Sequence, residues 1–144
     1  MLRSGDVVDL DLGVPEGREA GFLHPGVVVT AQRVLDEAPA VLQVVPLTSR
    51  VRWHVSEVAI EPDDANGLSR RSAAQCQHVR GVSVSRLRRT RGNVGIAVLA
   101  QIRETLAVLI DLPLGGHYRS KPMSRAGADW VIWLVDNRST PVAA

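Results

Sequence analysis

The sequence predicts an α+β domain in which short antiparallel strands come first and one amphipathic helix comes last. The chain has 144 residues, of which 45% are hydrophobic and 22% charged, the profile of one soluble globular domain. Short β-branched runs separated by Gly and Pro residues fill residues 5–84, and the apolar spacing becomes helical after residue 95. We therefore expect a small curved sheet or barrel closed by the helix.

The first expected strand, Gly5–Leu12, alternates apolar residues with Asp9 and Asp11, the pattern of a half-buried strand. Residues 13–25 contain three Gly and two Pro, too many breakers for a regular element, so we expect a long flexible loop there. Later strands are expected at Val27–Thr30, Val41–Leu47, Glu57–Glu61, Ala73–Val79 and, briefly, Val82–Val84. Turn residues at 62–67 separate the fourth strand from the fifth.

An amphipathic helix follows the strands. Its apolar residues are spaced 3, 3, 4 and 3 apart: Ile96, Leu99, Ile102, Leu106 and Leu109. Pro113 ends it, because proline cannot continue a helix. Residues 1–113 are therefore expected to form the domain, and the small and polar residues of 114–144 a loosely ordered C-terminal extension. Alternatively, the extension covers a groove or contacts a partner.

Composition excludes several classes of protein. No apolar run approaches the ~18 residues of a membrane-spanning helix and the N-terminus is charged, so we expect a cytoplasmic protein without membrane contact. The single Cys76 cannot form an internal disulfide, and the four His lack metal-binding spacing, so no metal or cofactor is expected. Motifs of nucleotide-binding proteins and serine hydrolases do not occur in the sequence.

Charge is segregated along the chain, although the formal net charge is only +2. Residues 1–64 contain eleven acidic residues and five Arg, whereas residues 65–103 contain eight Arg and no acidic residue. Such a basic segment is typical of a nucleic-acid contact, but an acidic protein partner fits it equally well.

Polar residues gather in the long loop and at the ends of the expected strands: Arg18, Glu19, His24, Thr48, Ser49, Arg50, Gln77 and His78. The order of these segments resembles the MazF/PemK family of toxin endoribonucleases from type II toxin–antitoxin systems. The resemblance covers about residues 3–113 and rests on Gly5-Asp6-Val7-Val8, Asp11-Leu12, Gly17-x-Glu19, Pro25-x-Val27-Val28-Val29, Val44-Val45-Pro46-Leu47-Thr48-Ser49, Gly67-Leu68, Cys76-Gln77-His78-Val79-Arg80 and Ser85-Arg86-Leu87. Several sequence motifs in the order and spacing of the family are more specific evidence for membership than any one motif alone.

The resemblance implies an SH3-like antiparallel β-barrel with a C-terminal helix. It implies a two-fold homodimer that cleaves single-stranded RNA without a metal, and a cognate antitoxin protein that blocks the RNA groove. In this family the 2′-hydroxyl attacks the adjacent phosphate, and an Arg before the loop proline and a Thr after the third strand promote the step. Thr48 matches the family threonine, and its hydroxyl can donate to a non-bridging phosphate oxygen.

The family arginine has no match here, because His24 precedes Pro25. Arginine stays charged and can donate two hydrogen bonds to one phosphate, whereas histidine, whose ordinary pKa is ~6.5, transfers protons better. His78 stands where family members usually carry Gln, so one hypothesis makes the two histidines acid and base in one RNA groove. Alternatively, Arg18 supplies the missing cation, or the protein has lost most of its activity.

We assign Thr48 to transition-state stabilisation and His24 to the place of the family arginine, as acid, base or phosphate ligand. RNA contacts are assigned to Arg18, Glu19, Ser49, Arg50, Gln77 and His78. Each histidine also has a structural interpretation, His24 as a solvent-exposed loop residue and His78 as a hydrogen-bonded strand residue.

A different class of function also fits the sequence. It is a non-catalytic binding module of the same fold, either a degenerate toxin that still binds its antitoxin or, as in CcdB-like toxins, an inhibitor of a protein target such as DNA gyrase. The arginines between residues 86 and 91 suit an RNA contact or an acidic antitoxin segment.

Overall fold

Seven short strands, two α-helices and two 3₁₀ turns make up the described part of the chain, residues 1–18 and 21–113 of the computed structural model. In chain order they are β1 (Asp6–Asp11), β2 (Leu23–Val28), α1 (Gln32–Leu35), β3 (Val41–Thr48), β4 (Glu57–Ile60), β5 (Ser72–Gln75), a 3₁₀ turn (Cys76–His78), β6 (Arg80–Ser83), a second 3₁₀ turn (Val84–Arg86), β7 (Leu87–Asn93) and α2 (Gly95–Leu109). None of the described helices is long and apolar enough to cross a membrane. The predicted extension, residues 114–144, lies outside the described residues.

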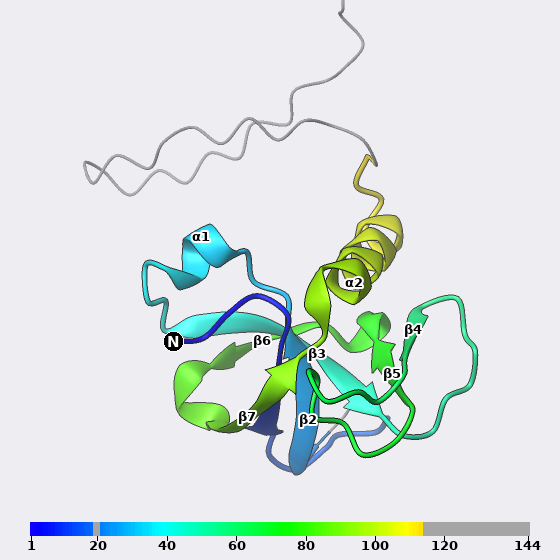
Figure 1. The fold of residues 1–144 in the computed structure, drawn as a ribbon, viewed down its shortest axis with the longest axis horizontal. Coiled ribbons are helices and arrows are strands. Elements are labelled where there is room, and N and C mark those ends of the chain that lie inside the picture. Colours follow the sequence, from blue (N-terminus) through cyan, green and yellow to red (C-terminus); the bar gives the residue numbers. More distant parts are fainter. Residues whose placement is uncertain (19–20, 114–144) are drawn as a thin grey trace, which may run out of the picture.

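The strands pair antiparallel along the path β4-β5-β3-β2-β1-β7, and β6 pairs with the first half of β3. Figure 1 shows the strands curving around one another, with α2 on one side of them. The path is open, because its two end strands, β4 and β7, are not paired with each other in the described chain. A sheet-dominated α+β domain with a C-terminal helix is therefore confirmed, but strand pairing does not close the expected barrel.

The loop between β4 and β5, which contains the predicted turn at 62–67, fills the gap between β4 and β7. Its Ala65 carbonyl accepts a hydrogen bond from the backbone N–H of Asn93 at 2.8 Å. The two backbones approach so closely that a Cβ on Gly92 would lie 2.1 Å from the Ala65 oxygen, so only glycine fits there. Asn66 stabilises the loop from inside, because its buried side chain bonds three backbone groups of that loop.

The central strands are buried on both faces, and each face carries its own apolar cluster. The cluster under α2 includes Val7, Val27, Val45, Leu47, Val58, Ile60, Leu99 and Ile102. The second cluster includes Val8, Leu10, Val28, Leu35, Leu42, Val44 and Val82. β1 is therefore not the half-buried strand that its alternation predicts: even Asp9, on its polar face, is only 7% exposed.

α2 covers the first cluster with one face. Leu99 and Ile102 are buried and Leu106 packs against them, as the spacing predicts. Ile96, by contrast, is 90% exposed and Leu109 is 43% exposed, so the prediction is wrong for the first and last residues of the apolar stripe. At 3.6 residues per turn, Ile96 lies about 90° from the centre of the face that the other three residues define.

Two predicted strands differ from the structure by more than two residues at one end. β2 begins before the expected Val27 and takes in His24 and Pro25, which the sequence places in the loop. Pairing with β1 overrides the low strand propensity of these residues. The expected strand Ala73–Val79 ends at Gln75, where a 3₁₀ turn redirects the chain toward β6.

The sequence does not predict β7, because its exposed and Arg-rich sequence lacks apolar alternation. β7 forms by pairing with β1, and two register shifts leave Arg88 and Arg91 without a partner residue on β1. Each of these extra residues pairs with an aspartate of β1. Arg88 Nη2 lies 3.1 Å from Asp11 Oδ2, and Arg91 Nη2 lies 2.8 Å from Asp9 Oδ1. Acidic and basic segments that are far apart in the sequence are thus neighbouring strands.

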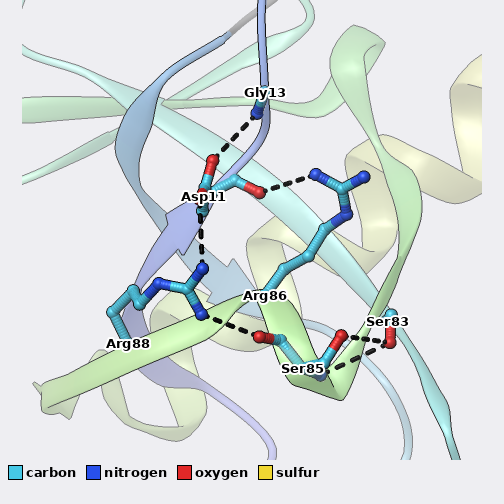
Figure 2. A network of polar contacts seen from close by, with 6 residues as sticks. All are labelled: Asp11, Gly13, Ser83, Ser85, Arg86 and Arg88. Atoms are coloured by element: carbon cyan, nitrogen blue, oxygen red, sulfur yellow. Dashed lines mark hydrogen bonds and ion pairs between the residues drawn. The ribbon is translucent and has the colours of Figure 1, made fainter.

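Asp11, at the end of β1, is the centre of the polar network in Figure 2. Its carboxylate accepts hydrogen bonds from the Gly13 N–H at 3.2 Å and from Arg88 at 3.1 Å, and its carbonyl accepts one from Arg86 at 3.0 Å. Arg88 also donates to the Ser85 carbonyl at 2.7 Å. The Gly13 N–H and then Arg88 hold the pKa of the Asp11 carboxyl below its usual range. This network fixes the start of the β1–β2 loop against β7.

Candidate active site

A pocket of about 250 Å³ lies where β2 begins and β3 ends. The β2–β3 pairing ends at Gly26 and Pro46, and His24 and Thr48 each lie two residues beyond it. Both residues line the pocket. The remaining lining consists of polar Ser49, Ser69, Arg70, Ser72 and Arg91 and apolar Pro25, Leu47 and Leu68.

His24 lines this pocket from the start of β2. Its side chain is half-buried, and its Nε2 atom is buried without a hydrogen-bond partner among the described residues. An imidazole nitrogen can accept or donate a proton, and the tautomer decides which. His24 is therefore not the solvent-exposed loop residue of the structural interpretation.

Thr48 ends β3 and holds its hydroxyl in a defined orientation. The Oγ1 atom accepts a hydrogen bond from the backbone N–H of Arg50 at 3.1 Å, a turn that ends the strand. A hydroxyl that accepts one hydrogen bond can still donate its own hydrogen, so Thr48 can donate to an acceptor in the pocket. Ser49 is exposed in the pocket lining, whereas the exposed Arg50 side chain does not line the pocket.

Two arginines of the pocket are not among the site residues that the sequence suggests. Arg70 is exposed in the β4–β5 loop, which reaches β7, and Arg91 is the extra residue at the first register shift of β7. The signal that pointed to them is the basic segment, residues 65–103. Which of its eight arginines reach the pocket depends on how β7 pairs with β1, and local sequence does not encode that pairing.

Other predicted site residues lie away from this pocket. Arg18 is exposed in the β1–β2 loop. Gln77 is exposed and His78 half-buried in the 3₁₀ turn after β5, and neither lines the pocket. His24 is thus in the pocket without His78, an arrangement that the two-histidine hypothesis does not predict. Glu19 lies outside the described residues.

The pocket offers groups that suit an anionic ligand. An imidazole transfers protons, hydroxyl groups donate single hydrogen bonds, and guanidinium groups bind phosphate oxygens in pairs. No acidic side chain lines this pocket in the described chain. Nor is any group of three or more His, Cys, Asp or Glu residues within residues 1–18 and 21–113 arranged to hold a metal ion.

Comparison with known proteins extends these observations. The model of the family described as PemK-like, MazF-like toxin of type II toxin-antitoxin system matches residues 3–110. Endoribonuclease MazF9 of Mycobacterium tuberculosis (strain ATCC 25618 / H37Rv) is 33% identical over 116 residues, which cover 78% of this chain and 98% of the relative.

Solved structures share the fold. MazF (Form-I) from Deinococcus radiodurans superposes with a TM-score of 0.64 at 25% identity. The match covers 75% of this chain and 94% of the Deinococcus chain. An endoribonuclease in complex with its cognate antitoxin, from Mycobacterial species, superposes with a TM-score of 0.63 at 23% identity. The match covers 78% of this chain and 98% of that chain. Toxin MazF-mt6 of Mycobacterium tuberculosis superposes with a TM-score of 0.61 at 20% identity. The match covers 75% of this chain and 98% of that toxin.

Proposed function

Because the chain belongs to the PemK-like, MazF-like toxin family of type II toxin–antitoxin systems, we propose that it is the toxin of such a system and cuts single-stranded mRNA. In this proposal it is a sequence-specific endoribonuclease that needs no metal, and residues 1–113 form its catalytic domain. An mRNA substrate implies that the protein acts in the cytoplasm.

The observation that carries the proposal is that the side chains of His24 and Thr48 line the same pocket. Attack by a 2′-hydroxyl requires removal of its proton, stabilisation of charge on the phosphorane oxygens, and protonation of the leaving 5′ oxygen. The imidazole supplies a proton acceptor, and the hydroxyl supplies a donor for a phosphate oxygen.

In the proposed reaction, the imidazole of His24 takes the proton from the 2′-hydroxyl. The 2′ oxygen then bonds to phosphorus while the bond from phosphorus to the 5′ oxygen breaks, which leaves a 2′,3′-cyclic phosphate and a 5′-hydroxyl. The Thr48 hydroxyl donates to the non-bridging oxygen whose negative charge grows. The 5′ oxygen takes a proton from water, and the hydroxide that remains takes the proton back from the His24 imidazolium. Contacts to flanking nucleotides are proposed for Arg18, Glu19, Ser49, Arg50, Gln77 and His78.

Cleavage of a mixed-sequence RNA in EDTA, followed by mapping of the product ends, tests this function. We expect specific cuts with cyclic-phosphate ends. Loss of a proton acceptor in His24→Gln should lower kcat by ~10²–10⁴-fold. Loss of the donor in Thr48→Ala should lower it by ~10²–10³-fold. Thr105→Ala, which changes a hydroxyl on α2 outside the pocket, is the matched control. RNA that stays intact with the wild-type chain, while an antitoxin still binds, would support the non-catalytic module instead.

We also propose a two-fold homodimer that binds a cognate antitoxin. Support for the antitoxin partner comes from structural neighbours, which include an endoribonuclease in complex with its cognate antitoxin and a MazE-MazF complex from Deinococcus radiodurans. Light scattering of the purified chain measures the subunit number. An antitoxin that occupies the pocket should lower the cleavage rate in proportion to the fraction of toxin bound.

A further inference from the structure

Arg91 occupies an unusual position in β7. Val7 of β1 pairs with Gly92, but the next residue, Val8, pairs with Thr90, so Arg91 is the extra residue of a β-bulge. A bulge turns the extra side chain out of the regular alternation of the strand, and bulges are frequent beside active sites. In this chain the bulge directs the Arg91 side chain to the pocket that His24 and Thr48 also line.

Asp9 fixes the guanidinium of Arg91. Both Nε and Nη2 of Arg91 lie 2.8 Å from one oxygen of Asp9, Oδ1. The Asp9 side chain is 10% exposed, so little water competes for its carboxylate, whereas Arg91 is 31% exposed. A guanidinium has five N–H donors; Asp9 accepts a hydrogen bond from Nε–H, and Nη2 lies within ion-pair distance of the same oxygen. In the described chain no other group accepts from Arg91, so the fixed guanidinium can bind a second anion.

Arg91 differs from the other arginine of the pocket. Arg70 is exposed, and among the described residues no side chain or backbone group fixes its guanidinium. A preorganised charge stabilises a transition state better than a mobile one, because no reorganisation is needed as the charge develops. A guanidinium also keeps its charge at neutral pH and can donate two parallel hydrogen bonds to a phosphate, which the imidazole of His24 cannot do.

We propose that Arg91 is the cation that binds the scissile phosphate, and that Asp9 is the positioning residue that directs it. This inference rests on the function proposed above and assigns that site its fixed positive charge. The division of labour is then complete: His24 moves the proton, Thr48 donates one hydrogen bond, and Arg91 holds the phosphate oxygens. The charge comes from β7, the last strand, and not from the residue before Pro25.

Kinetics of RNA cleavage by three variants test the proposal: Arg91→Gln, Asp9→Asn, and the double variant of both. Arg91→Gln leaves a buried carboxylate without its partner, which can unfold a protein, so the double variant provides a neutral pair that can still hydrogen-bond. Arg33→Gln, on exposed α1 and outside the pocket, is the matched control. The thermal midpoint of each variant is measured beside kcat and KM.

We expect the double variant to fold and to lose ~10²–10³-fold in kcat, as other enzymes do when one fixed donor is removed. Asp9→Asn keeps an acceptor for Arg91 but holds it less firmly, so we expect a loss of up to ~10²-fold in kcat. KM should change less than kcat in both, because the charge acts on the developing transition state. A merely structural Asp9 would lower the thermal midpoint and leave the kcat of the folded protein unchanged.

Two results overturn the proposal and are distinguishable. If the folded double variant cuts RNA at the wild-type rate while Thr48→Ala does not, Arg91 is not the phosphate ligand and the proposed function stands. If the wild-type chain cuts no RNA, the proposed function fails, and the assignment of Arg91 fails with it.

Discussion

Arg88 of β7 donates a hydrogen bond to the carboxylate of Asp11 on β1, across 77 positions of the sequence. Arg88 is the extra residue of the second register shift in β7, as Arg91 is of the first. The β1–β7 strand pair therefore contains two bulges, each of which places an arginine beside an aspartate of β1. One bulge fixes a loop, and the other directs a cation into the pocket.

Asp11→Asn should lower the thermal midpoint at neutral pH, because it removes the charge that Arg88 binds. The Gly13 N–H and Arg88 hold the pKa of the carboxyl below its usual 3.8. This contribution to stability is therefore present above pH 3.8 and is lost as the pH falls through the lower folded pKa. Thermal melts from pH 2 to 7 measure the difference, with Asp64→Asn, an exposed turn residue, as control. A difference that stays constant at the acid end would contradict the expectation.

Cys76 should be unreactive in the folded protein. It is buried, and burial raises the pKa of its thiol to about 11. Since the chain has one cysteine, a thiol reagent such as DTNB reports on Cys76 alone. We expect reaction at pH 7.5 only as fast as the protein unfolds, and immediate reaction in guanidinium chloride. Fast labelling of the native protein would show an accessible thiol.

The same thiol should make the protein less stable in alkali. The folded state holds the proton more tightly, so this contribution to stability is full below pH 9.0 and declines as the pH rises toward about 11. Cys76→Ala removes the titrating group and serves as the comparison. Denaturant melts at pH 8 and pH 10.5 should show a smaller loss of unfolding free energy in the variant than in the wild type.

Arg103→Met should weaken the attachment of α2 to the sheet. The guanidinium donates to the Val29 carbonyl at 3.1 Å and bonds the Ser4 hydroxyl, and desolvation lowers its pKa. Methionine keeps the apolar stem and removes the donors, so we expect a loss of about 1–2 kcal/mol in unfolding free energy. Urea melts measure it, and Gln101→Met, an exposed change on the same helix, should leave the midpoint nearly unchanged.

Gly92→Ala should be strongly destabilising although it adds one methyl group. The new Cβ would lie 2.1 Å from the Ala65 oxygen, so backbone must move, and overpacking of this kind costs about 1–3 kcal/mol. Gly81→Ala is the matched control, since its Cβ would lie 3.3 Å from a side-chain methyl of Val41. Equal melting of the two variants would mean that the loop does not press on β7.

Local patterns in the sequence predict much of the fold. The apolar spacing that places Leu99 and Ile102 on one helix face is a property of neighbouring residues, and so is the β-branched run at 27–29. Local patterns do not predict β7, because this exposed Arg-rich segment becomes a strand only by pairing with β1. The acidic and basic segments of the sequence are not separate in space, since Asp9 and Asp11 form ion pairs with two arginines of the basic segment.

The candidate site is predictable in part for the same reason. Resemblance to known toxins selects His24 and Thr48, and both line one pocket, although their catalytic roles stay predictions. Arg91 reaches that pocket through a bulge and an ion pair 82 positions away in the sequence. His78 lies in a turn where the sequence predicts a strand, so the alternation of side chains along a strand does not place it.

The loop between β4 and β5 joins β7 by backbone contact at Ala65, where a strand ladder would otherwise close the sheet. Arg70 lies in that loop and Arg91 precedes Gly92, so the loop and β7 each contribute one arginine to the pocket. Leu68 of the same loop lines the pocket and also belongs to the apolar cluster under α2. A change in the length of this loop would therefore alter the nucleotides that enter the pocket and the packing of that cluster together.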